Sequence, residues 1–119
     1  MLSLDTHILV FALSGDLSLR EQSLLSDQLW SVSAIVLWEL AKLTSLGRID
    51  LDLDSQEFSQ LLSRVRIWPL DFAVCKQTMA LDFRSDPADE IIAATSIVHR
   101  VPLLTRDRKL RNSKLIPLA

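Results

Sequence analysis

Short apolar segments alternate with longer helix-forming stretches along almost the whole chain, and this alternation most constrains its fold. The short segments cover residues 2–4, 30–33, 66–70, 101–105 and 115–118. Strands of a parallel sheet are buried on both faces and are connected by helices, which produces this pattern. We therefore predict an α/β fold, a three-layer α/β/α sandwich around a parallel sheet of about five strands.

The stretches between these segments carry helical spacing together with start and stop signals. Helices are predicted over residues 6–13, 17–29, 34–46, 55–65, 71–83 and 86–99. Gly47 is a typical residue just past a helix end, and Pro87 occupies the first helical position that proline favours. Residues 49–54 alternate Ile or Leu with Asp, which fits an edge strand or an extended loop, and the loop is the favoured interpretation.

Length and composition exclude several classes of protein. A chain of 119 residues, 49% hydrophobic, predicts one domain over residues 1–119. The 13 basic and 15 acidic residues give a net charge of -2, which excludes a polycation. The longest uncharged stretch, residues 28–38, has 11 residues, whereas a membrane span needs about 18 or more. One cysteine, Cys75, and two histidines exclude an internal disulfide and a zinc cage. Without a signal-like start, the expectation is a cytoplasmic protein with no membrane contact.

Acidic and hydroxyl side chains fall where the predicted strands end. They are Asp5 after the first strand, Ser33 and Glu39 after the second, Asp86 and Asp89 before the fourth, and Thr105 and Asp107 after it. Ligands of open α/β sheets bind outside the carboxyl ends of the strands. Four separate segments are therefore expected to bring acids to one edge of the sheet.

Helix capping is an alternative role for several of these residues, because Asp and Ser are among the best N-caps. It applies to Asp5, Ser33 and Asp107, and it is the favoured interpretation for Asp86 before Pro87. Asp107 could also pair with Arg108 or Arg111.

Glu39 is harder to explain as a structural residue. It lies in an almost entirely apolar helix, Ala-Ile-Val-Leu-Trp-Glu-Leu-Ala. Burial of an unpaired carboxylate is costly or raises its pKa. A surface pair with Lys42 is the alternative, but a glutamate directed into a polar cleft fits this sequence better.

Several carboxylates at close range repel one another unless they are protonated or bridged by a cation. An all-oxygen site without His or Cys suits Mg²⁺ or Mn²⁺ rather than Zn²⁺. Such a site activates water and stabilises charge on a phosphodiester, which is nuclease chemistry.

The segments that carry the acids also match a known family. They are Leu-Asp5-Thr6-His7, Ser33-Ala-Ile-Val-Leu-Trp-Glu39-Leu, Asp86-Pro-Ala-Asp89-Glu-Ile-Ile-Ala-Ala-Thr and Leu-Leu-Thr105-Arg-Asp107. In this order and spacing the chain resembles the PIN domain from Met1 to Leu118, in particular the VapC-type ribonuclease toxins of toxin–antitoxin modules.

The resemblance implies a metal-dependent endoribonuclease with Mg²⁺ or Mn²⁺ as cofactor. Asp5, Glu39, Asp89 and Asp107 correspond to the family's acidic quartet. Asp5 and Asp89 would be the principal metal ligands, with Glu39 and Asp107 binding directly or through water.

Further residues and partners follow from the same resemblance. Thr6, Ser33 and Thr105 would hydrogen-bond around the quartet, and Asp86 would support it from the helix cap. The expected partners are an RNA substrate, a small antitoxin protein and a second copy in a homodimer. Two departures from the family pattern are Ala88, where relatives often carry a bulky aromatic, and Glu90, where Arg or Lys is common.

Residues 100–114 carry six basic residues and one acid. Four of the six flank Asp107 and fit either contacts to RNA phosphates or a solvated surface; they are Arg106, Arg108, Lys109 and Arg111. A second cluster contains only leucines, for which ordinary core is favoured over a protein-binding face; these are Leu13, Leu17, Leu24, Leu25 and Leu29.

Two other classes of function compete with the ribonuclease. A non-catalytic RNA- or protein-binding module on the same fold would bind without turnover. A receiver-like phosphotransfer domain built on Asp5 ranks last, because His7 and Asp107 stand where it would need an acid and a lysine.

Overall fold

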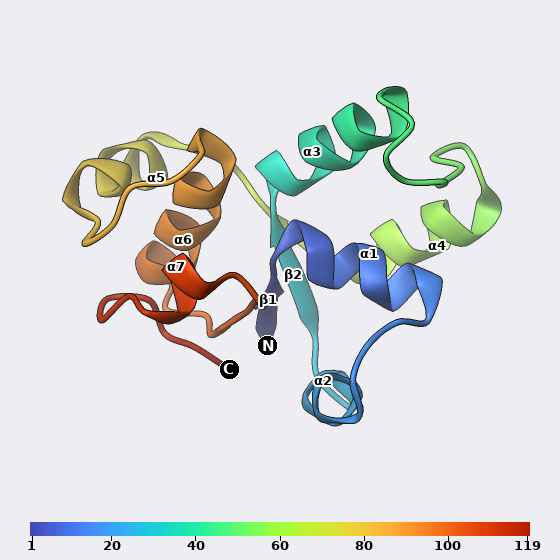
Figure 1. Ribbon diagram of the computed structural model, residues 1–119, viewed down its shortest axis with the longest axis horizontal. Helices are drawn as coiled ribbons and strands as arrows, with labels where there is room; N and C mark the ends of the chain where they lie inside the picture. Colours follow the sequence, from blue (N-terminus) through green and yellow to red (C-terminus); the bar gives the residue numbers. More distant parts are fainter.

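The computed structural model describes all residues, 1–119, and has a central parallel sheet between two layers of helices (Figure 1). In chain order the elements are β1 (Leu2–Leu4), α1 (Thr6–Ser14), α2 (Leu19–Leu25), β2 (Trp30–Ser33), α3 (Ala34–Ser45), α4 (Gln56–Arg64), β3 (Arg66–Trp68), α5 (Phe72–Gln77), a 3₁₀ turn η1 (Thr78–Ala80), α6 (Pro87–His99), β4 (Leu103–Leu104) and α7 (Arg108–Arg111). The predicted α/β sandwich is therefore confirmed.

The sheet has four parallel strands in the order β3-β2-β1-β4. Ser3 of β1 lies opposite Ser31 of β2 and Leu103 of β4, which fixes the register. The expected fifth strand is reduced to one parallel bridge between Leu118 and Leu103. Pro117 lacks an N–H and cannot donate to a ladder, which explains why pairing here is so short.

Figure 1 shows α1 and α4 on one side of the sheet and α5 and α6 on the other. The sheet is buried from both sides: Leu4, Val32 and Leu103 have exposed fractions of 0%. Ile92 of α6 is also fully buried, and the neighbouring small residues Ala93 and Ala94 let this helix pack closely in the interior. No helix in the structure is long and apolar enough to cross a membrane.

Several predicted boundaries differ from the observed ones. The helix expected over residues 17–29 is only α2, which begins after a capping box at Ser18 and ends at Ser26. Asp27 has φ 59°, a left-handed conformation that ends the helix and redirects the chain into β2. β3 ends at Trp68 because Pro69 cannot continue the ladder.

The remaining differences are small. The helix expected over residues 71–83 becomes α5 followed by η1. Residues 49–54 form the favoured loop rather than a strand. The closing role predicted for Gly47 is consistent with its φ of 69°, which a side-chain-bearing residue rarely adopts.

The leucine cluster is mainly core, as favoured. Leu25 is buried, and Leu13, Leu17 and Leu24 are partly buried against the core. Leu29 is the exception, with 67% of its surface exposed.

Candidate active site at the carboxyl edge of the sheet

The carboxyl ends of β1 and β4 meet where the strand order reverses. The chain moves from β1 through β2 to β3 in one direction, and then returns to place β4 on the other side of β1. Such a switch point is where open α/β sheets bind ligands. Asp5 follows β1 and Thr105 follows β4, so both side chains emerge there.

Asp5 is the most buried acid of the group, with an exposed fraction of 5%. Its Oδ1 accepts a hydrogen bond from the backbone N–H of Thr6 at 2.7 Å, which caps α1. Its Oδ2 accepts from the Thr105 hydroxyl at 2.6 Å. The capping role and a role in the site therefore coexist in one carboxylate, because each uses a different oxygen.

Burial raises the pKa of Asp5 above its ordinary value of 3.8. The hydrogen bonds from Thr105 and Thr6 and the charge of His7 act in the opposite direction, while the charge of Asp107 raises the pKa further. This carboxylate is thus held in an environment that disfavours its negative charge unless a cation is added.

Glu39 reaches the same place from α3. It is half-buried, and its Oε1 accepts a hydrogen bond from the Thr6 hydroxyl. Burial raises its pKa, the Thr6 hydroxyl lowers it, and the charges of Asp89 and Asp5 raise it. The alternative ion pair with Lys42 is not formed, since the structure has one ion pair, between Arg106 and Glu21.

Asp89 enters the group from the first turn of α6. Its Oδ2 accepts a hydrogen bond from the Ser85 hydroxyl at 2.9 Å. Burial raises its pKa, and the charges of Asp5, Asp107 and Asp86 act in the same direction.

Ser85 is a site residue that the sequence pattern did not single out. The available signal was a hydroxyl residue just before the helix cap, four positions before Asp89. Ser85 also contacts Glu90, one of the two departures from the family pattern. Its backbone N–H donates to Glu90 Oε2 at 3.1 Å. The Glu90 carboxylate therefore accepts a hydrogen bond at the start of α6. Ala88, the other departure, is buried with an exposed fraction of 8%.

Asp107 completes the set from the segment after β4. Its Oδ1 accepts from the backbone N–H groups of Lys109 at 2.8 Å and Leu110 at 3.3 Å, so it caps α7. Its own N–H donates to the Thr105 hydroxyl at 3.0 Å. Thr105 therefore connects Asp5 and Asp107 directly.

Two predicted residues have no direct contact with the quartet. Ser33 caps α3 by accepting from the Ile35 N–H at 3.3 Å. Asp86 occupies the cap position of α6, but its side chain makes no capping hydrogen bond. Its contribution is the negative charge that acts on Asp89.

The chemistry of this group suits a hard divalent cation with few protein ligands. The acids act electrostatically on one another, and no His or Cys contributes a nitrogen or sulfur ligand among them. No three of them lie close enough to form a ready-made metal cage. Mg²⁺ is commonly bound by one or two carboxylates and keeps several of its waters, so the residues present fit such an ion.

The basic residues beside the quartet have different environments. Arg106 binds Glu21 through two hydrogen bonds of 2.7 and 2.8 Å. Arg111 donates from Nη1 to the Thr105 carbonyl at 3.2 Å. The other two basic residues, Arg108 and Lys109, are exposed on α7, and their side chains make no hydrogen bond.

The raised pKa values predict how stability depends on pH. Because Asp5, Glu39 and Asp89 have higher pKa values folded than their ordinary 3.8, 4.5 and 3.8, the folded chain binds more protons than the unfolded chain above those values. In excess chelator the melting temperature should therefore rise as pH falls toward those ordinary values. Asp5→Asn should show a smaller rise, and identical pH profiles for the two proteins would contradict this explanation.

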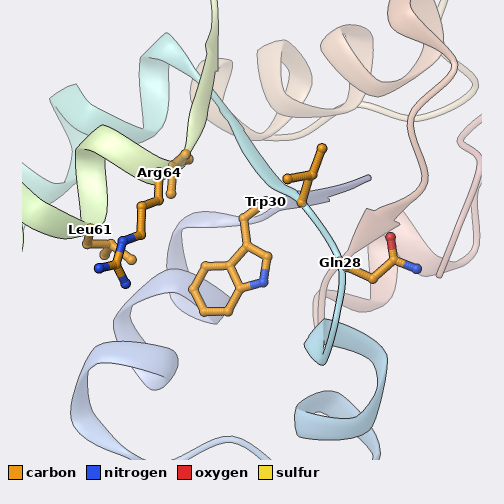
Figure 2. A pocket seen from close by; sticks show the side chains of 6 residues that line it. Gln28, Trp30, Leu61 and Arg64 are labelled. Carbon is orange, nitrogen blue, oxygen red and sulfur yellow. The ribbon is translucent and has the colours of Figure 1, made fainter.

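A hollow of about 290 Å³ lies away from the acids. Figure 2 shows the Trp30 indole in its middle, with Leu61 and Arg64 of α4 on one side and Gln28 on the other. Trp30 begins β2, so this hollow is near the amino end of that strand, whereas the acids gather at the carboxyl edge. The titratable groups, rather than this hollow, identify the candidate active site.

Comparison with known proteins agrees with this fold. The family model described as the PIN domain matches residues 2–114. Ribonuclease VapC22 from Mycobacterium tuberculosis is 38% identical over 92 residues, which are 75% of this chain and 70% of that protein. The chain therefore belongs to the PIN-domain family, in the branch that contains the VapC ribonucleases.

Solved structures show the same fold. A toxin–antitoxin complex from Klebsiella pneumoniae contains a chain with a TM-score of 0.73 and 22% identity, covering 94% of this chain and 92% of that one. VapBC2 from Rickettsia felis, bound to a DNA fragment from its promoter, has a TM-score of 0.73 and 21% identity, covering 98% of this chain and 96% of that one.

Proposed function

We propose that this chain is a metal-dependent endoribonuclease and the toxin of a toxin–antitoxin module, acting in the cytoplasm. The observation that carries the proposal is the convergence of Asp5, Glu39, Asp89 and Asp107 from four segments onto one edge of the sheet, where burial and mutual repulsion raise the pKa of the first three. The 38% identity to a ribonuclease supports RNA as the substrate.

In this proposal Asp5 and Asp89 are the principal ligands of Mg²⁺ or Mn²⁺, and Glu39 and Asp107 bind it directly or orient its waters. A divalent ion at these residues supplies an activated water and stabilises charge on the scissile phosphodiester. Thr105 holds Asp5, and Thr6 holds Glu39, each through a hydroxyl donor. Oε2 of Glu39 remains without a hydrogen bond, whereas both oxygens of Asp5 accept one and each would use its second lone pair for the ion.

Arg108 and Lys109 are the basic residues best placed to hold RNA phosphates, because their side chains are exposed and unengaged. They lie on α7 directly after Asp107, so they would bind the backbone beside the acids. Phosphate contacts position a nucleic acid without reading its sequence.

The partner proposed for regulation is a small antitoxin protein. Complexes between a toxin and an antitoxin from Klebsiella pneumoniae and Rickettsia felis contain chains of this fold. A homodimer, which the family resemblance implies, is part of the same proposal.

The direct test is cleavage of tRNA and other structured RNA by the purified chain, with Mn²⁺ and with excess chelator. We expect internal cuts with Mn²⁺ and none with chelator. RNA binding without cleavage in either condition would favour the non-catalytic module. Cleavage that persists in excess chelator would contradict the role of the metal.

A further inference from the structure

Arg106 lies between Thr105 and Asp107 in the sequence, yet its side chain binds Glu21 of α2 rather than any of the four acids. Its Nε donates to Glu21 Oε2 at 2.8 Å and its Nη2 to Glu21 Oε1 at 2.7 Å, a two-pronged ion pair. Nη2 also donates to the Asp16 carbonyl at 3.1 Å. The guanidinium carbon lies 4.0 Å from the centre of the Phe11 ring. Arg106 thus connects the segment after β4 to the end of α1 and the start of α2.

Glu21 is built into the fold rather than free on the surface. Its exposed fraction is 6%, and it completes the capping box of α2 by accepting from the Ser18 N–H at 2.8 Å. The Arg106 hydrogen bonds are the main reason that its pKa falls to about 2. Because Glu21 is buried and its Oε1 is also held by the Ser18 N–H, it provides Arg106 with a rigid attachment point.

The segment that bears Thr105 and Asp107 has little support from the sheet. Apart from Arg106, it is held by the fully buried Leu110 and by the Arg111 side chain, which donates to the Thr105 carbonyl. β4 consists of Leu103 and Leu104 alone, and its pairing with β1 ends at the Asp5 N–H to Leu104 carbonyl hydrogen bond of 3.1 Å. Beyond that point the chain leaves the sheet and enters the four-residue helix α7. A helix this short does not hold its own position by backbone bonding.

We propose that the Arg106–Glu21 ion pair is a positioning device that holds Thr105 and Asp107 at the proposed metal site. Arg106 acts through the backbone on both neighbours, so that the Thr105 hydroxyl reaches Asp5 and the Asp107 carboxylate stays on the site side. This inference rests on the proposed function. It assigns to Arg106 a role different from the phosphate contact that the sequence suggested.

The two roles of Arg106 predict different effects of one substitution. If Arg106 held phosphates, Glu21→Gln would free its guanidinium and tighten RNA binding, with a steeper salt dependence. If Arg106 positions the segment, Glu21→Gln loosens the site and leaves RNA binding unchanged. Glutamine still serves the capping box of α2, so this variant removes the charge of the pair while preserving the helix start.

The experiment measures Mn²⁺-dependent cleavage of tRNA by the full chain and by Glu21→Gln and Arg106→Lys, with Arg48→Gln as a control. Lysine keeps the charge of Arg106 but lacks its two-pronged donor geometry. We expect the half-saturating Mn²⁺ concentration to rise about tenfold in both variants, the size typical for residues that support metal ligands. KM for tRNA and its salt dependence should stay unchanged. Arg48 is exposed and makes no side-chain hydrogen bond, so its variant should match the parent.

A second readout does not depend on enzymatic activity. Amide hydrogen exchange at Lys109 and Leu110 reports whether Asp107 still caps α7. We expect faster exchange at both amides in Glu21→Gln and Arg106→Lys and parent-like exchange in Arg48→Gln. This measurement decides the inference even if the parent does not cleave RNA, which would overturn the proposed function alone.

Two results would overturn the positioning role. One is Glu21→Gln with tighter tRNA binding and an unchanged Mn²⁺ requirement, which would assign Arg106 to the phosphates. The other is parent-like exchange at Lys109 and Leu110 in both variants, which would show that the ion pair does not hold the segment.

Discussion

Replacement of Asp5 by asparagine is expected to reduce metal-dependent RNA cleavage by about two to three orders of magnitude or more, as when one preorganised electrostatic group is removed from an active site. Asp5 is the central acid of the group, because it is hydrogen-bonded to Thr105 and its charge raises the pKa of both Glu39 and Asp89. The measurement is the single-turnover cleavage rate with Mn²⁺.

The fold should survive this substitution. Asparagine retains one oxygen that can accept from Thr6 or Thr105, and it removes a buried negative charge whose pKa is raised by burial. Circular dichroism should therefore match the parent protein. Asp50→Asn is the matched control, because Asp50 is exposed in the loop after α3 and its side chain makes no hydrogen bond. Equal cleavage rates for Asp5→Asn and Asp50→Asn would exclude Asp5 from catalysis.

The second large effect concerns stability. Ile92→Ala is expected to lower the free energy of unfolding by about 2–5 kcal/mol, because it removes buried methyl groups and leaves a cavity. Ile92 has an exposed fraction of 0% and belongs to the main core cluster. It lies one turn after Asp89 on α6, so its packing also determines where that acid is held.

Urea denaturation measures this change directly. Ile67→Ala is the control, since Ile67 lies on the edge strand β3 with 40% of its surface exposed. Its cost should be about 1 kcal/mol or less. Equal losses for the two variants would mean that α6 is not packed as described.

The placement of the four acids can be predicted from the sequence because strand ends and helix starts are local features. Asp5 and Asp107 follow apolar strands directly, and the parallel arrangement brings them to one edge. Glu39 is recognisable because a charged residue in an apolar helix needs a special environment. The observed hydrogen bond from Thr6 supplies part of that environment.

What the sequence does not predict depends on contacts between distant residues. Arg106 has the appearance of a phosphate-binding residue within a basic segment, but its partner Glu21 is 85 positions away along the chain. Local charge counts contain no information about such a pairing. The support that Ser85 gives to Asp89 was missed for a related reason, because the pattern of a helix start does not show which acceptor a hydroxyl chooses.

Helix lengths also depend on tertiary contacts. The apolar spacing of residues 17–29 continues beyond Leu25, the last residue of α2. The N–H of Leu2 instead donates to the Leu29 carbonyl at 2.9 Å, so the end of this segment pairs with β1 and does not continue the helix. Tertiary pairing of this kind overrides local propensity.

Calorimetric titration of the metal-free protein with Mn²⁺ determines whether the four acids form a site for a divalent cation. We expect saturable binding to the parent chain and to Asp50→Asn, and loss of that binding in Asp5→Asn and Asp89→Asn. Undiminished Mn²⁺ binding by Asp5→Asn and Asp89→Asn would contradict this expectation.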